Sequence, residues 1–159
     1  MKRTIKTAIL FLCGYSLYLA IEVTFRSILN NGGNGFSNPI CGIMGAICFL
    51  VCDMINNRIS WDIDLFLQGI IGSSVVTALE LIVGILDRWL LEFRMWDYST
   101  MPLNFMGVIC VPFSIAWVGL TIVAIFVADA INYYGFHEEP CPHYHIWKYQ
   151  FKFKERRDA

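Results

Sequence analysis

Long apolar segments alternate with short polar segments along this chain. Four apolar segments are long enough to cross a membrane as helices, namely residues 7–25, 39–55, 63–86 and 104–131. A bilayer core about 30 Å thick requires roughly 20 apolar residues in a helix. Because lipid offers the backbone no hydrogen-bond partners, and because the segments lack the alternation of a β-barrel, we predict helices. The expected fold is an all-α integral membrane four-helix bundle formed by residues 1–131.

Composition supports this class and excludes others. Of the 159 residues, 57% are hydrophobic and 16% are charged, whereas a soluble domain is about 45–50% apolar and about 25% charged. A soluble core of this size would leave much apolar surface in water. The net charge of −1 provides no basic field that would hold a polyanion. We therefore expect contact with the lipid bilayer and no nucleic-acid partner.

The distribution of basic residues predicts the orientation. Nine of the 12 Lys and Arg residues lie in the N-terminus, in the loop after the second span or in residues 132–159, and the other three are Arg26, Arg88 and Arg94. Because cytoplasmic segments are enriched in Lys and Arg, we predict that the N- and C-termini both face the cytoplasm. Residues 132–159 would form a basic and aromatic cytoplasmic tail that lies against anionic headgroups.

Two carboxylates fall inside the predicted spans. Glu22 lies near the outer end of the first span, and Glu80 lies six residues before Leu86 in the third. A charge at the bilayer centre costs at least ~2.5–3.5 kcal/mol on insertion scales, so each carboxylate needs a reason. Glu22 has Arg26 four residues later as a partner. Glu80 has no cation within four positions, so it pairs with another span, stays protonated or faces a water-filled cavity.

Small and polar residues recur every three or four positions in two spans. In the third span they are Gly69, Ser73, Thr77, Glu80, Gly84 and Asp87, and in the fourth they are Asn104, Gly107, Ser114 and Thr121. Such spacing places each set on one helical face, and small residues let helix backbones approach closely. We predict that these faces pack inside the bundle. Pro112 predicts a kink or a steep tilt in the fourth span.

The loop after the third span is the most distinctive local sequence. Asp97 and Ser99 are suited to capping a turn or the next helix, and the aromatic side chains of Trp96 and Tyr98 suit the membrane interface. Because this loop and both intramembrane carboxylates fall on the outer side, we hypothesise an outward-facing polar site for a cation or a small polar ligand. Its ligand-linked or proton-linked residues would be Glu22, Glu80, Asp97 and Asn104, and its entrance would be lined by Trp96, Tyr98 and Ser99.

Several kinds of chemistry are missing from the sequence. No Walker-type phosphate loop and no visible nucleophile–base pair occur, so we predict neither an enzyme nor a bound cofactor. The segment from Cys141 to His145 supplies only three candidate ligands, which does not lead us to predict a metal site.

Several motifs together resemble a known family. They are Glu22 near the end of the first span, Asn38-Pro39-Ile40-Cys41-Gly42, the stretch from Glu80 to Gly84, Trp96-Asp97-Tyr98-Ser99, Asn104, Gly107 and Trp117. This pattern resembles the bacterial family described as Putative ABC-transporter type IV, which is catalogued as transporter permeases. The resemblance implies a multi-pass protein of the bacterial cytoplasmic membrane and a cytoplasmic ATPase subunit as a partner. Because ABC permeases generally have more than four spans, it also implies a homo-oligomer.

Three functional hypotheses follow. The first is a transport component that resembles an ABC transporter permease, in which Glu80 is linked to a ligand or proton and Asp97 and Asn104 orient it. The second is a small proton-coupled exporter that uses Glu22. The third is a non-transporting accessory subunit, whose intramembrane carboxylates only pair with neighbouring helices.

Overall fold

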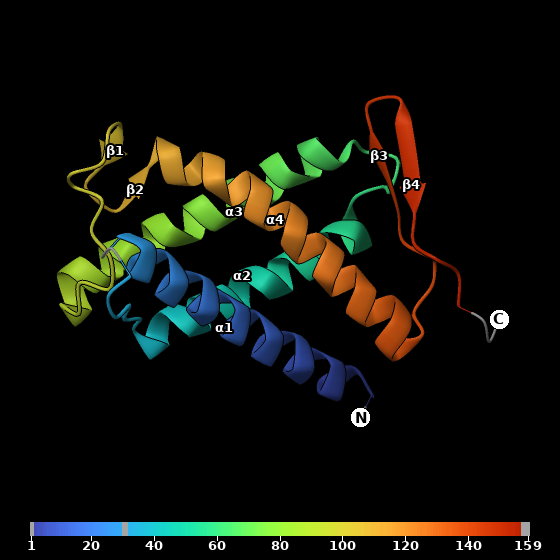
Figure 1. The fold of residues 1–159 in the computed structure, drawn as a ribbon, viewed down its shortest axis with the longest axis horizontal. Helices are drawn as coiled ribbons and strands as arrows, with labels where there is room; N and C mark the ends of the chain where they lie inside the picture. The colour runs from blue at the N-terminus through green and yellow to red at the C-terminus, as the bar shows by residue number, and fades with distance from the viewer. Residues whose placement is uncertain (1, 30–31, 157–159) are drawn as a thin grey trace. The chain divides into compact units, whose positions relative to one another are not determined.

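The computed structural model describes residues 2–29 and 32–156, so Asn30, Asn31 and the tail residue Arg157 lie outside the described residues. The helices are α1 (Lys2–Leu29), α2 (Pro39–Arg58), α3 (Leu65–Leu86) and α4 (Val111–Ala130) (Figure 1). Each is long and apolar enough to cross a membrane. The predicted all-α membrane fold with four spanning helices is therefore confirmed.

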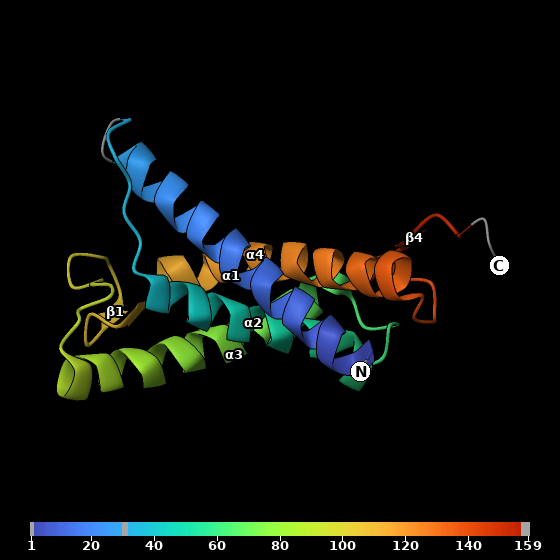
Figure 2. The same ribbon diagram turned by 90° about the horizontal axis from the view of Figure 1, so that it is seen from below.

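The chain forms two compact units, Met1–Val51 and Cys52–Ala159. In the first unit, α1 packs closely on the beginning of α2 (Figure 2). A Cβ atom built on Gly14 would lie 2.4 Å from the Cβ of Phe49, and one on Gly45 would lie 2.2 Å from the Cβ of Tyr18. Because neither position has room for a side chain, the two helix backbones approach each other as small residues in membrane helices allow.

In the second unit, α3 packs against the part of α4 from Ser114 to Ile122, and the two helices cross in the view of Figure 1. The Ser73 hydroxyl of α3 donates a hydrogen bond of 2.6 Å to the carbonyl oxygen of Ser114 in α4. The stripe predicted on the third span is the face that α3 buries, since it contains the buried residues Gly69, Ser73, Glu80, Gly84 and, just after the helix, Asp87. This part of the predicted packing is confirmed.

The fourth helix begins later than predicted. Residues 104–110 form a short antiparallel hairpin of β1 (Asn104–Phe105) and β2 (Ile109–Cys110), so Asn104 and Gly107 precede the helix. The backbone between these strands is left-handed at Met106 and Gly107, which no α-helix accommodates. Pro112 then lies in the first turn of α4, where its missing N–H leaves no bond unmade. The prediction that this proline kinks the span is wrong for that reason.

Two short π-helices continue the last helices, η1 (Asp87–Leu91) after α3 and η2 (Ile131–Gly135) after α4. The predicted tail is partly folded, because β3 (His143–Ile146) and β4 (Tyr149–Lys152) form a second antiparallel hairpin.

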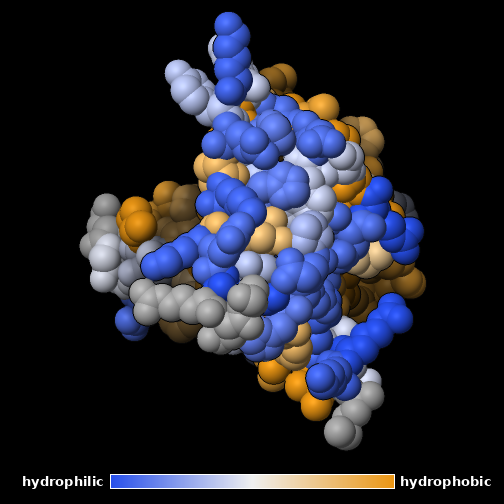
Figure 3. All heavy atoms as spheres, turned by 90° about the vertical axis from the view of Figure 1, so that its right-hand side faces the viewer, coloured by the Kyte–Doolittle hydropathy of each residue, from blue (hydrophilic) through white to orange (hydrophobic). Residues whose placement is uncertain are grey.

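The C-terminal hairpin is held against the body of the second unit. Tyr144 is fully buried, and its ring meets the ring of Phe126 edge to face at 4.6 Å between centroids. The backbone N–H of Trp147 donates a hydrogen bond of 2.7 Å to Asp64, which also caps the start of α3. Hydrophilic residues gather at this end of the unit (Figure 3). The loop before α3 and the tail, both predicted on the cytoplasmic side, therefore lie at one end of the second unit.

Candidate functional site

Glu80 is a buried carboxylate inside a membrane-spanning helix. Its side chain belongs to α3, and the residue is 2% exposed. The indole N–H of Trp117 in α4 donates a hydrogen bond of 2.8 Å to Oε2, and the phenol of Tyr98 donates one of 3.3 Å to Oε1. Among the residues that the structure describes, no Lys or Arg forms an ion pair with it. Its hydrogen bonds therefore come from uncharged aromatic side chains.

Tyr98 is itself held in place by α4 and by the loop. Its ring stacks on Phe113 with 4.6 Å between centroids and 18° between planes. Its backbone N–H donates a hydrogen bond of 2.8 Å to the carbonyl oxygen of Gly107. The phenol that contacts Glu80 is thus fixed on both its ring and its backbone, which limits how far it can move without the loop.

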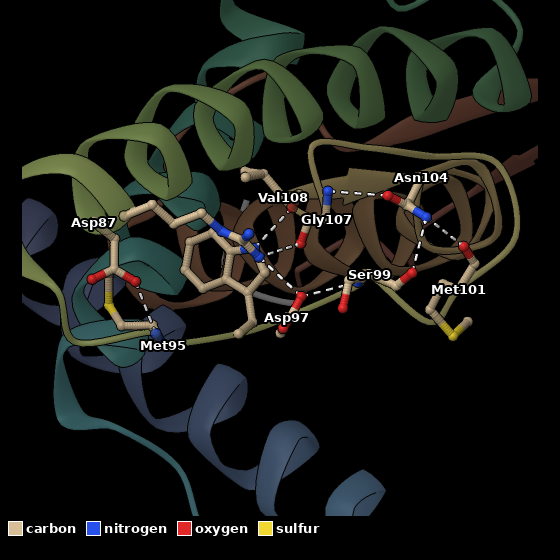
Figure 4. A network of polar contacts seen from close by, with 10 residues as sticks. Asp87, Met95, Asp97, Ser99, Met101, Asn104, Gly107 and Val108 are labelled. Carbon is tan, nitrogen blue, oxygen red and sulfur yellow. Dashed lines mark hydrogen bonds and ion pairs between the residues drawn. The ribbon is translucent and has the colours of Figure 1, made fainter.

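Asp97 lies in the loop and organises it (Figure 4). Its Oδ1 accepts hydrogen bonds of 2.9 Å from the backbone N–H of Ser99 and from the guanidinium of Arg88. The same guanidinium donates a bond of 2.9 Å to the carbonyl oxygen of Gly107. The Ser99 N–H, the Ser99 hydroxyl and the Arg88 guanidinium lower the pKa of the Asp97 carboxyl. The turn predicted to be capped by Asp97 is confirmed.

Asn104 uses its whole side-chain amide within the loop. Its Nδ2 donates to the carbonyl oxygens of Ser99 at 3.3 Å and Met101 at 2.8 Å, and its Oδ1 accepts from the backbone N–H of Gly107 at 3.0 Å (Figure 4). Gly107 has φ +65°, and a Cβ on it would lie 3.0 Å from Nη2 of Arg88. Glycine adopts this left-handed backbone conformation without strain and leaves room for the Arg88 guanidinium.

The loop is also fixed to the end of α3. Asp87 is 2% exposed, and its two carboxylate oxygens accept hydrogen bonds from the backbone N–H groups of Phe93 at 3.0 Å and Met95 at 2.8 Å. The indole N–H of Trp96 donates a bond of 2.8 Å to the carbonyl oxygen of Val108. These bonds pair backbone groups that would otherwise be costly to place near a membrane.

The structure brings together most of the predicted site residues in the second unit. A chain of direct contacts joins them, running from Glu80 through Tyr98, Gly107 and Asn104 to Ser99 and Asp97, with Trp96 bonded to the same loop. Glu22 belongs to the first unit. It accepts a hydrogen bond of 2.5 Å from Arg26 and another from the hydroxyl of Ser37. The predicted pairing of Glu22 with Arg26 is confirmed.

Two residues that contact the site residues were not among those predicted. Trp117 entered only through the family resemblance, although it supplies the shorter bond to Glu80. Its spacing of three residues from Ser114 and four from Thr121 puts it on the small and polar face of the fourth span. Arg88 is the ion-pair partner of Asp97 at 2.9 Å. The indole N–H of a tryptophan such as Trp117 needs an acceptor when it lies on a packing face, and that requirement is a usable sequence signal.

The Asp97 ion pair has an expected pH dependence. Because the folded-state pKa of Asp97 is lowered below its ordinary value of about 3.9, its contribution to loop stability is present above that pH and is lost as the pH falls through the folded-state pKa. We expect the tryptophan fluorescence of wild type and Asp97→Asn to differ by a constant amount from pH 5 to 8. That difference should shrink only as the pH falls below the ordinary value of about 3.9 and through the folded-state pKa. A fluorescence difference that changes between pH 5 and 7 would mean that a titratable group other than Asp97 controls the signal.

Comparison with curated proteins and with solved structures found no match. A model of the family described as Putative ABC-transporter type IV matches residues 9–152. The matched range contains Glu80, the loop that carries Tyr98 and Asp97, and Trp117. It also extends into both the first and second units. The resemblance seen in the motifs is therefore confirmed, and the chain belongs to the family described as Putative ABC-transporter type IV.

Proposed function

We propose that this multi-pass membrane protein is a non-enzymatic transport component in which Glu80 contacts the transported species or carries a proton linked to its movement. The family and the four spanning helices support a transport-related membrane protein at the coarser level. In the proposal, Asp97 and Asn104 keep the loop in shape, and Trp96, Tyr98 and Ser99 line the approach from outside.

The observation that carries the proposal is the buried carboxylate of Glu80. It lies roughly 16 Å from Leu91 at 1.5 Å per helical residue, within the apolar part of the span. A carboxylate at this depth is costly without a neighbouring cation, and such residues commonly mark a substrate, ion or proton pathway. Its neighbours Trp117 and Tyr98 supply N–H and O–H groups, together with ring faces that attract cations.

The proposed orientation and partners rest on charge and on the family. The excess of Lys and Arg in the N-terminus, the loop after α2 and the tail supports a cytoplasmic location for those segments. The loop that carries Asp97 would then face outside. We further propose a cytoplasmic ATPase subunit, which an ABC-type transporter requires, and assembly of more than one copy of this chain.

A specific observation favours a second candidate, the accessory subunit. Both oxygens of Glu80 accept hydrogen bonds within the second unit, as a carboxylate with a purely structural role would. The exporter hypothesis receives less support, because the two oxygens of Glu22 accept bonds from Arg26 and Ser37. The deciding experiment must therefore separate a transport role of Glu80 from a packing role.

Glu80→Gln is the test. The tagged full chain would be purified from its native membranes in a mild detergent, and ATP hydrolysis by the co-purified protein would be measured after reconstitution into liposomes. Because glutamine keeps the volume and an acceptor for Trp117, we expect the amount of protein to stay within twofold of wild type. Coupled ATP hydrolysis should fall by about tenfold, roughly the effect of losing 1.4 kcal/mol of a required interaction.

Thr77→Val is the matched control, because Thr77 lies one turn from Glu80 and bonds Ser114 at 3.2 Å in the same interface. This variant removes a polar group without touching the carboxylate, so ATP hydrolysis should be retained. If Glu80→Gln lowers only the abundance of the protein, the accessory-subunit hypothesis replaces the proposed transport role. If no ATPase co-purifies from native membranes, the ABC-type mechanism is wrong for this chain.

A further inference from the structure

A second buried polar cluster lies away from Glu80, near the ends of α2 and α4. It contains two Asp and Asn pairs, and in each pair the asparagine follows the aspartate by three residues. Asp53 and Asn56 belong to α2, whereas Asp129 lies at the end of α4 and Asn132 lies in η2. All belong to the second unit, and each is between 6% and 8% exposed. Residues three apart share a helical face, so each helix presents one carboxylate and one amide together.

The two pairs bond reciprocally. Nδ2 of Asn132 donates a hydrogen bond of 2.6 Å to Oδ1 of Asp53, and Nδ2 of Asn56 donates one of 2.7 Å to Oδ2 of Asp129. The phenol of Tyr144 in β3 donates a further bond of 2.6 Å to the same oxygen of Asp129. The cluster therefore joins α2, the α4–η2 helix and the C-terminal hairpin.

The amide oxygens of this cluster have no donor. Because a carboxylate accepts and an amide NH₂ donates, both asparagines must turn their nitrogens toward the aspartates. That orientation leaves Oδ1 of Asn56 and Oδ1 of Asn132 buried without a hydrogen-bond partner among the described residues. A buried acceptor left in this state typically costs about 1–3 kcal/mol. A ligand that attracts oxygen atoms would remove that cost.

The charge of the cluster points to the same kind of ligand. Asp53 and Asp129 are close enough to interact electrostatically. Neither forms an ion pair with a Lys or Arg within residues 2–29 and 32–156. The two asparagines and Tyr144, all uncharged side chains, donate hydrogen bonds to these carboxyl groups. Two buried carboxyl groups and two buried amide oxygens without a partner among the described residues thus occur together.

We propose that Asp53, Asn56, Asp129 and Asn132 bind a hard metal cation, of the class that includes Mg²⁺, Ca²⁺, Na⁺ and K⁺. Carboxylate and amide oxygens are the ligands that such cations prefer. Bound there, the cation neutralises the two aspartates and takes up the orphaned amide oxygens. Because Tyr144 bonds Asp129, the cation also strengthens the attachment of the C-terminal hairpin to the helices.

Cation-dependent thermal stability tests the proposal. The purified full chain in detergent would be treated with a chelator and exchanged into N-methyl-D-glucamine chloride, then titrated with MgCl₂, CaCl₂, NaCl or KCl. Unfolding would be followed by tryptophan fluorescence. A cation present at 100 times its Kd should raise the Tm by about 5 °C or more, and the Tm should continue to rise with the logarithm of the cation concentration. The four salts distinguish a monovalent from a divalent occupant, and a shift with any of them that exceeds the shift in N-methyl-D-glucamine chloride supports the site.

Matched variants locate the effect. Asp53→Asn should abolish the shift, whereas Asp62→Asn should retain it, since the Asp62 side chain is 85% exposed near the same end of the unit. Glu80→Gln should also retain it, which makes this result independent of the proposed transport role. Asn132→Asp adds a third carboxylate and should reach a given Tm shift at a cation concentration about tenfold lower than wild type does.

The contrary results are equally specific. A shift that N-methyl-D-glucamine chloride reproduces at matched ionic strength would overturn the proposal, because it would reflect screening alone. A shift that survives in Asp53→Asn would place the cation elsewhere. If Asp53→Asn does not fold, Asn132→Asp decides the matter, since an unchanged cation dependence in that variant excludes the site.

Discussion

Asp87→Ala is expected to destabilise the protein more than any other single truncation in the loop region. The variant leaves two backbone N–H groups, those of Phe93 and Met95, without the carboxylate that accepts their hydrogen bonds. Losing the acceptor of a buried N–H typically costs about 1–3 kcal/mol, and because the Met95 bond is buried and the Phe93 bond partly buried, the loss should be roughly 2–5 kcal/mol. For a chain of this size, that corresponds to a fall in Tm of roughly 5–15 °C.

The measurement is thermal unfolding of the purified chain in detergent, followed by tryptophan fluorescence. Asp62→Ala is the control, because it deletes a carboxylate that is 85% exposed and should change stability by no more than about 0.5 kcal/mol. Asp87→Asn should fall between wild type and Asp87→Ala, since one amide oxygen can still accept. Equal effects of Asp62→Ala and Asp87→Ala would mean that the bonds of Asp87 do not hold the loop to α3.

Gly72→Ala is expected to disrupt the packing of α3 on α4 despite being a small change. A Cβ on Gly72 would lie 2.2 Å from Cγ2 of Thr121, a distance that real Cβ atoms do not adopt. The helices must therefore separate or shift, and overpacking of this kind typically costs about 1–3 kcal/mol. We expect a lower Tm and a smaller yield of monodisperse protein in size-exclusion chromatography.

Two companion variants make this result specific. Gly119→Ala places the same methyl group on α4 where nothing lies within 4 Å, so it should be neutral or stabilise the helix by about 0.5–1 kcal/mol. Thr121→Ser removes Cγ2 and keeps the hydroxyl, so it should rescue Gly72→Ala in the double variant. If Thr121→Ser fails to rescue, the clash with Thr121 is not the cause of the defect.

The sequence predicted the spans and the packing stripe well, for a simple physical reason. Length and hydropathy determine whether a helix can cross a bilayer, and both are local properties. The spacing of Gly69, Ser73 and Gly84 likewise reports one helical face without any knowledge of its partner. Much of the candidate site followed as well, because Tyr98, Asp97 and Asn104 lie close together in the chain.

The features that sequence reasoning missed depend on contacts between distant residues. Residues 104–110 are apolar enough to extend the fourth span, and the turn that interrupts them depends on bonds to Asn104 and Arg88. The Asp53 and Asp129 pairs also escaped notice. A carboxylate near the end of a span ordinarily needs no partner, and bonds across 73 and 79 residues are not visible in local spacing.

The bond from Tyr144 to Asp129 also has a consequence for biosynthesis. Tyr144 follows Asp129 by 15 residues, so α4 is synthesised before the phenol that bonds its buried carboxylate. The same holds for the backbone N–H of Trp147, which reaches back to Asp64 at the start of α3. The contacts of the second unit are therefore complete only once the β3–β4 hairpin has been made and has docked. All spanning helices are already made when that event takes place.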